Sequence, residues 1–209
     1  MIAAALPLAA FGNTLPILQP ILPERPPAAV DERSNERWHA AVNEAFSDYA
    51  SFAPLLLANF ASLALDFIAR QKVQGQHLNW YIVEQLPIIP AAVFEQKIGK
   101  TKIADFIRGE VLHLTYTAHN MAPFAHDMGY DGPPFPWDED DRRHRRARLD
   151  ALFFRLYGID EDDAAYILDT FPIVREQDEA AFGRYLTKDL VLAYMRAVAV
   201  GDLKSRVTA

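Results

Sequence analysis

The stretch FAPLLLANFASLALDFIA, residues 52–69, constrains the fold more than any other part of this 209-residue chain. It is apolar and nearly long enough to cross a bilayer, which takes roughly 20 such residues. Asn59 and Asp66 lie inside it, however, and a charged side chain in the bilayer core is costly. We therefore predict a buried helix of a protein core in this stretch, and no membrane partner.

Residues 1–22 are also apolar, but Pro7, Pro16 and Pro20 divide them into pieces too short to span a membrane. They also lack the basic residues with which a secretory signal peptide begins. The chain has no cysteine, which excludes disulfides, cysteine nucleophiles and thiolate metal sites. A reducing, cytoplasmic location is predicted.

The pattern of apolar residues predicts mostly helices, because it repeats with helical spacing over long stretches. The expected helices cover residues 34–48, 54–72, 95–113, 138–157, 160–171 and 188–200. Residues 2–7 and 78–86 are strand-like, so a small sheet is expected near residues 1–22 and 76–90. The predicted fold is mainly α with a small β part (α+β) and a helical C-terminal half. It divides into residues 1–113, which hold the long buried helix, and residues 114–209.

Motifs for catalysis are missing from the sequence. There is no Gly-x-Ser-x-Gly elbow, no phosphate-binding glycine loop and no dinucleotide-binding glycine pattern. His113, His119 and His126 are six and seven residues apart, which does not match the i, i+4 spacing of a helical metal site. No catalytic, cofactor-binding or metal-binding residue is therefore predicted.

One basic cluster, Arg142-Arg143-His144-Arg145-Arg146, lies in the expected helix 138–157. Guanidinium groups match phosphate oxygens, so these arginines could form a DNA-contacting helix face. The alternative is a solvated face whose charge is balanced by the four acids at residues 138–141. The net charge of −7 gives no support to non-specific binding across the whole surface, so any nucleic-acid contact needs a local basic patch.

A second, weaker basic and polar patch runs from residue 70 to residue 79. It contains Arg70, Gln71, Lys72, Gln74, Gln76, His77 and Asn79, of which Arg70, Lys72, Gln76, His77 and Asn79 are the candidate contacts. Arginine, glutamine and asparagine are the side chains that bind base edges in a bidentate manner. These five residues, together with Arg142, Arg143, Arg145 and Arg146, are the predicted DNA-binding residues.

Three stretches carry a resemblance to a known family. ARQKVQGQHLNWYIVEQLPIIP followed by FEQKI resembles the target-recognition region of DNA adenine-N6 methyltransferases and single-chain restriction–modification enzymes. RLDALFFRLYGIDEDDAAYILDTFPIVREQDEAAFGRYLTKDLVLAYMRA is similar to the C-terminal end of large methyltransferases of the phage-defence type. LTYTAHNMAPFAHDMGYDGPPFPW fits the same family, so the resemblance covers essentially the whole chain.

The resemblance implies a fragment of a larger enzyme. In that family the Asn/Asp-Pro-Pro-Tyr/Phe motif and the S-adenosylmethionine pocket lie upstream of everything in this sequence, so no cofactor is expected in this chain. The implied function is a DNA target-recognition and C-terminal module that lacks the catalytic core. Its implied partners are double-stranded DNA and the methyltransferase core. The alternative is a free-standing helical interaction module that docks through its apolar N-terminus.

Overall fold

The structure is a computed structural model that describes residues 21–25, 32–73 and 78–208. The elements in these ranges are α1 Glu32–Ala61, α2 Leu63–Lys72, α3 Trp80–Val83, α4 Ala91–Phe94, β1 Lys97–Ile98, β2 Thr101–Lys102, α5 Ile103–Thr115, the 3-10 helix His119–Met121, α6 Ala122–Asp127, α7 Glu139–Leu156, α8 Glu161–Asp169, α9 Pro172–Phe182 and α10 Leu186–Ala199. The prediction of a mainly α fold with a small β part is confirmed.

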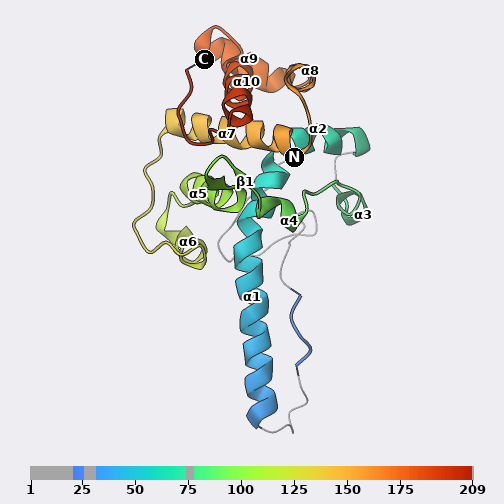
Figure 1. The fold of residues 1–209 in the computed structure, drawn as a ribbon, viewed down its shortest axis with the longest axis vertical. Helices are drawn as coiled ribbons and strands as arrows, with labels where there is room; N and C mark the ends of the chain where they lie inside the picture. The colour runs from blue at the N-terminus through green and yellow to red at the C-terminus, as the bar shows by residue number, and fades with distance from the viewer. Residues whose placement is uncertain (1–20, 26–31, 74–77, 209) are drawn as a thin grey trace.

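Helix α7 is the centre of the fold (Figure 1). One of its faces belongs to a cluster that we call the α5 core, with Leu55 of α1, Phe94 of α4, Ile107 of α5 and Leu152 of α7. The opposite face belongs to the α10 core, whose fully buried members are Ala64, Ala151, Phe154, Ala164, Leu168 and Val191. Helices α8, α9 and α10 lie on one side of α7, and α1 and α5 lie on the other (Figure 1).

The long apolar stretch is broken at Ser62, whereas one continuous helix over residues 54–72 was predicted. Helix α1 continues through Pro54, where we expected a new helix to begin, and ends at Ala61. The Ser62 hydroxyl then accepts a hydrogen bond from the N–H of Leu65, and the Asp150 carboxylate accepts one from the N–H of Leu63 at 2.8 Å. These acceptors cap the first turn of α2, so the helix restarts at an angle of 66° to α1.

The N-terminal half of α1 projects away from the other helices, alongside residues 21–25 (Figure 1). No residue of α1 before Pro54 is buried. Of the apolar residues on this half, Trp38, Val42 and Tyr49 are only half-buried, and Phe46 is exposed. No single helix of the described ranges is long and apolar enough to cross a membrane, whereas the bent pair of α1 and α2 passes that test by length and composition.

The location of the predicted sheet is wrong where the structure describes it. Residues 78–86, expected as a strand, contain α3, and the N–H of Glu84 donates to the Trp80 carbonyl at 3.0 Å. The backbone groups of this segment are therefore satisfied within the segment itself, as in a helix, and not by a neighbouring strand. Ile82 and Leu86, four residues apart, face the core, which is helical spacing. The other predicted strand, residues 2–7, lies outside the described residues.

The observed two-stranded sheet lies inside a predicted helix. Lys97 pairs with Lys102 and Ile98 with Thr101 in an antiparallel hairpin, so the helix expected from residue 95 begins at Ile103 instead. Gly99 permits the tight turn because its φ is +59°, a conformation that residues with a side chain rarely adopt. A Cβ at this position would lie 2.3 Å from the Gly201 carbonyl oxygen, so the hairpin closes directly on the chain after α10.

The C-terminal half follows the predicted pattern more closely. Helices α7, α8 and α10 lie within two residues of their expected bounds. Helix α9, residues 172–182, was not predicted; Pro172 occupies its first turn, where the missing N–H costs no bond. The predicted boundary between residues 113 and 114 falls inside α5, and Val198 and Leu203 of the C-terminal region belong to the α5 core.

Candidate nucleic-acid interface

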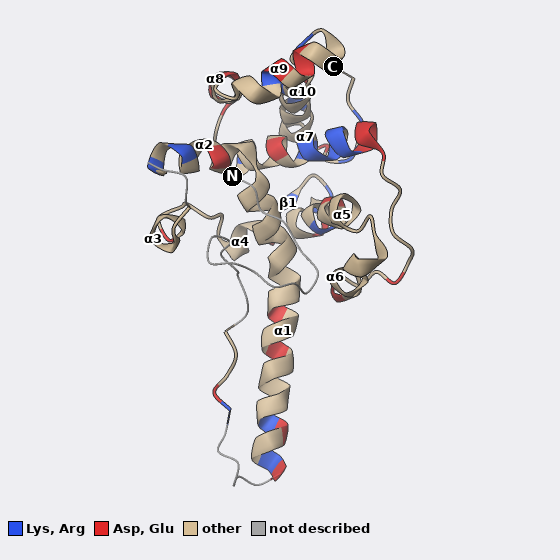
Figure 2. Ribbon diagram, turned by 180° about the vertical axis from the view of Figure 1, so that it is seen from behind, with Lys and Arg blue, Asp and Glu red and all other residues tan. Residues whose placement is uncertain are grey.

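The arginines of α7 lie close together on one helix, as the sequence indicates (Figure 2). Most of them already bind other groups of the protein. Glu110 of α5 is buried beneath them and accepts from Arg145 at 3.3 Å and from Arg148 at 3.2 Å. Arg145 also binds Asp141 at 2.6 Å, one turn earlier on α7. The ion pairs with Glu110 link α7 to α5, so Arg145 has a structural role.

Arg142 and Arg143 are also occupied. Arg142 donates to the Leu114 carbonyl at 2.9 Å, and its guanidinium lies 3.7 Å from the centre of the Trp137 ring. Arg143 pairs with Asp140 at 3.1 Å. Only Arg146 is exposed among the four predicted DNA contacts of α7, and its distance to the Glu139 carboxylate is 3.9 Å. The geometry therefore favours a charge-balanced helix over a phosphate-binding face.

Burial and the arginines act in opposite directions on Glu110. Loss of hydration raises its pKa, and the charges of Arg148 and Arg145 lower it; burial is the larger influence, so the pKa is raised above the ordinary value. The nearby imidazole of His113 has a lowered pKa, chiefly because it is partly buried and also because Arg145 is close. The His113 ring stacks on the Phe135 ring, with 3.7 Å between the ring centroids.

The second predicted patch occupies the end of α2 and the start of α3. Arg70 pairs with Asp66 at 3.0 Å and lies 4.6 Å from the centre of the Phe171 ring, whereas Lys72 is exposed. Asn79 is exposed at the N-cap position of α3, and its side chain makes no capping hydrogen bond. Gln76 and His77 lie outside the described residues.

Two aromatic residues next to this patch were missed as functional candidates. Trp80 is 53% exposed and Tyr81 is 61% exposed, although both are large and apolar. Because residues 78–86 were predicted to be a strand, Trp80 and Tyr81 were assigned to a sheet and not to an exposed site. That signal is an adjacent aromatic pair beside basic and amide side chains, the combination with which proteins bind nucleotides.

A buried hydrogen-bond network holds the segment that follows α3. Asn59 of α1 is completely buried; its side-chain oxygen accepts from the N–H of Ile89 at 2.9 Å, and its nitrogen donates to the Tyr157 hydroxyl at 2.7 Å. The Tyr157 hydroxyl donates to the Pro87 carbonyl at 2.9 Å. The Leu-Pro-Ile-Ile-Pro turn is thus fixed to α1 and to the end of α7, while Leu86 packs with Leu65 and Ala69 of α2.

Replacing Asn59 with alanine is expected to lower the free energy of unfolding by about 2–3 kcal/mol, because it leaves the buried N–H of Ile89 without an acceptor. Urea denaturation measures the loss, and hydrogen exchange at the Ile89 amide should accelerate more than exchange in α10. Asn43→Ala on the exposed part of α1 is the control, with an expected change within about 0.5 kcal/mol. Equal effects of the two substitutions would contradict the role of the network.

Comparison of this chain with known protein families, curated proteins and solved structures gives no match. Within residues 21–25, 32–73 and 78–208, no group of three or more histidine, aspartate or glutamate side chains could hold a metal ion. The candidate site therefore consists of the exposed residues at the α2–α3 junction, with Arg146 as the most accessible of the α7 arginines.

Proposed function

We propose that this chain is a DNA target-recognition and helical C-terminal module of an adenine-N6-specific DNA methyltransferase or restriction–modification enzyme, without a catalytic core of its own. The observation that carries the proposal is the exposure of Lys72, Asn79, Trp80 and Tyr81 at the junction of α2 and α3. Helix α3 lies beside the C-terminal end of α2 in both views, at the edge remote from α5 and α6 (Figures 1 and 2).

The exposed residues offer three complementary contacts to DNA. The Lys72 ammonium pairs with a phosphate, and the Asn79 amide can donate to N7 and accept from N6 of an adenine. Trp80 and Tyr81 can stack on bases that leave the helical stack beside the target adenine, which itself is flipped into the catalytic pocket of the methyltransferase core. The Asn59 network supports this segment from beneath, which keeps the contact residues in a fixed arrangement.

The acidic balance of the chain limits what it does alone. With a net charge of −7 and most of the α7 arginines paired, the chain neutralises few phosphates. We expect weak binding to duplex DNA with a shallow dependence on salt. In this proposal a cytoplasmic methyltransferase core supplies the remaining phosphate contacts, S-adenosylmethionine and the catalytic residues.

Fluorescence anisotropy with a labelled duplex at low salt tests the interface. Trp80→Ala is expected to weaken binding by about tenfold, because stacking of one base contributes about 1–3 kcal/mol. Lys72→Ala should reduce the slope of log affinity against log salt by about 1, as expected for the loss of one phosphate contact.

Two substitutions at exposed positions elsewhere serve as controls. Tyr166→Ala on α8 removes an aromatic ring that is 68% exposed, and Lys100→Ala in the β1–β2 turn removes an exposed lysine. Both should bind like the wild type. If Trp80→Ala and Tyr166→Ala weaken binding equally, the α2–α3 junction is not the interface.

One observation favours the second candidate, a free-standing helical interaction module. Trp38, Val42, Ala45 and Tyr49 repeat at spacings of four, three and four along the projecting half of α1, the seam of a two-helix coiled coil. A partner helix could pack on this stripe beyond Trp38, whose indole already donates to the Pro23 carbonyl and lies under Arg25. This candidate predicts no measurable DNA affinity, so the anisotropy titration separates the two.

A further inference from the structure

The N-terminal part of α1 projects from the rest of the molecule. We call residues 32–50 the α1 arm, and residues 51–73 and 78–208 the body. Helix α1 has no buried residue before Pro54, and the arm extends about 28 Å at 1.5 Å per residue (Figure 1). An arm of this length offers a partner helix a contact of about five turns.

Four charged residues form a row along one side of the arm. Arg33, Arg37, Glu44 and Asp48 are spaced by four, seven and four residues, which are spacings that return to the same side of a helix. All four side chains are exposed. The arginines lie near the free end and the two acids lie nearer the body, so the row is positive at one end and negative at the other (Figure 2).

This order of charges is unfavourable for a single helix. Arg33 and Arg37 are like charges one turn apart, and so are Glu44 and Asp48. Arg33 also lies in the first turn, at the positive end of the helix dipole. Glu36 follows Arg33 by three residues, yet the described part of the chain shows no ion pair between them. The row therefore breaks local rules of helix stability, as natural sequences do at functional surfaces.

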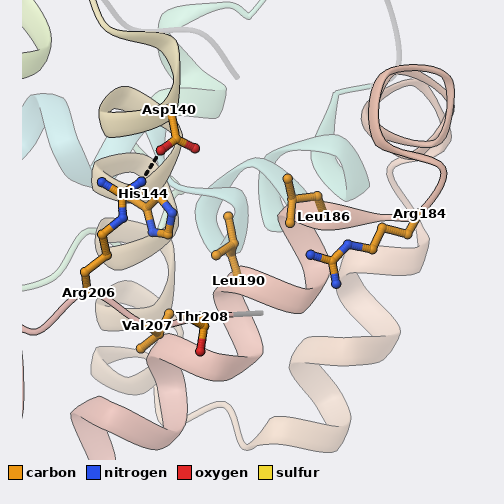
Figure 3. Close-up of a pocket in the computed structure, with 8 residues that line it drawn as sticks. All are labelled: Asp140, His144, Arg184, Leu186, Leu190, Arg206, Val207 and Thr208. Atoms are coloured by element: carbon orange, nitrogen blue, oxygen red, sulfur yellow. Dashed lines mark hydrogen bonds and ion pairs between the residues drawn. The ribbon is translucent and has the colours of Figure 1, made fainter.

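Charged side chains of the body have partners where those of the row have none. Beside the cavity of about 320 Å³ at α7, α10 and the end of the chain, Asp140 pairs with Arg206, and Arg184 lies 3.6 Å from the Asp189 carboxylate (Figure 3). Within residues 21–25, 32–73 and 78–208, none of the four charges of the row is in an ion pair. Their partners are thus not supplied by the described part of the same chain.

We propose that the α1 arm binds the α1 arm of a second copy of this chain in the antiparallel direction. In an antiparallel pair of identical helices the same side of each helix faces the partner, so the basic end of one row lies along the acidic end of the other. Arg33 pairs with Asp48 of the second copy, and Arg37 pairs with Glu44 in the same register. Twofold symmetry makes each contact twice. Ala41, which is half-buried, lies beside the centre of this register, and its small side chain lets the helices approach closely.

The position of the arm also favours the antiparallel direction. The body follows the C-terminal end of the arm, so an antiparallel partner carries its own body at the opposite end of the contact (Figure 1). A parallel pair would place the two bodies side by side, and the basic row of one arm would not face the acidic row of the other. The inference goes beyond DNA target recognition, because the α2–α3 junction belongs to the body and stays outside the contact.

Sedimentation equilibrium of the full chain tests the proposal. We expect the mean mass to rise from 23.6 kDa toward twice that value as the protein concentration increases. Added salt should shift the equilibrium toward the monomer, because salt screens exposed ion pairs. A dimer that is insensitive to salt would contradict the pairing of the two rows.

Charge reversal of the row gives the sharper test. Arg33→Glu with Arg37→Glu makes the row wholly acidic, and Glu44→Arg with Asp48→Arg makes it wholly basic. Each double variant should self-associate at least about tenfold more weakly than the wild type, because every attractive pair becomes a repulsive one. An equimolar mixture of the two variants should associate more tightly than either variant alone, since an acidic row then meets a basic one.

Asp162→Arg with Glu176→Arg is the matched control, because it changes the net charge as much as the wholly basic variant does, at exposed positions of α8 and α9. It should associate like the wild type. Circular dichroism verifies that each variant keeps its helices. The proposal is overturned if the wild type stays at 23.6 kDa up to millimolar concentration, if the row variants associate like the control, or if the mixture associates no more tightly than its components.

Discussion

Glu110→Gln is expected to lower the free energy of unfolding by about 3–5 kcal/mol, the largest effect of any single substitution proposed for this protein. The side chains of Arg145 and Arg148 are only 16% and 14% exposed and share the Glu110 carboxylate as their common acceptor. Glutamine keeps the shape but removes the negative charge, so the two cations remain largely buried without neutralisation by α5. Urea denaturation measures the loss.

A surface pair provides the control for this substitution. Glu95 pairs with Lys102 at 2.6 Å, but its side chain is 62% exposed, so Glu95→Gln should cost less than about 1 kcal/mol. A triple variant with leucine at 110 and 145 and methionine at 148 should regain much of the stability lost by Glu110→Gln, because no unpaired charge then remains buried. A loss no larger than that of Glu95→Gln would show that water reaches the arginines.

Asp150 is expected to make the protein less stable as the pH rises from about 4 to about 7. The carboxyl is buried among α2, α7 and the α10 core, and burial raises its pKa to about 7, against the opposing influences of the Leu63 N–H and Arg146. The unfolded chain has an ordinary aspartate pKa near 3.8. Between these values the folded state binds more protons than the unfolded state, so stability is greatest below the lower pKa and falls as pH rises through the higher one.

The full decrease is on the order of 4 kcal/mol, since each unit of pKa difference corresponds to about 1.4 kcal/mol. Asp150→Asn keeps an oxygen that can accept from the N–H of Leu63 but does not titrate. Urea denaturation from pH 4 to pH 8 should therefore give a steeper fall for the wild type than for Asp150→Asn. Asp162→Asn, at an exposed position of α8, should keep the wild-type slope. Parallel curves for the wild type and Asp150→Asn would refute the assignment.

Helices with local start signals could be predicted from the sequence. Asp138 accepts from the N–H groups of Asp140 and Asp141 at 2.9 Å, and Asp160 accepts from that of Asp163 at the same distance. Gly158, with φ of +71°, ends the first of these helices. Each signal lies within three residues of the backbone group that it satisfies, so a single sequence contains all the information needed.

Features that depend on distant partners could not be predicted. The bond from Ile89 to Asn59 joins residues 30 apart, and the bond between Asn59 and Tyr157 joins residues 98 apart. The capping of α2 by Asp150 crosses 87 residues. Without these contacts the apolar run at residues 78–86 is equally suited to a strand, and Pro54 is a natural place to begin a helix.

The candidate site shows the same limit. The sequence shows how many arginines α7 carries, but Glu110, which binds two of them, lies 35 residues before Arg145. Accessibility is likewise decided by packing: Ile82 is buried while its neighbour Tyr81 is 61% exposed. The basic and polar composition of the two candidate patches could therefore be predicted from the sequence, but which of their side chains are accessible could not.

The closure of the β1–β2 turn on Gly201 has a consequence for biosynthesis. The α5 core contains Leu55 and Phe94 but also Val198 and Leu203, and Arg148 donates to the carbonyl of Lys204 at 3.2 Å. A nascent chain on the ribosome consequently cannot complete the packing of α1 and α5 until residues 198–204 have emerged. Part of the apolar surface of α1 and α5 remains uncovered until that point of translation, so chaperones that hold emerging chains have access to it while the roughly 80 residues after α5 are being synthesised.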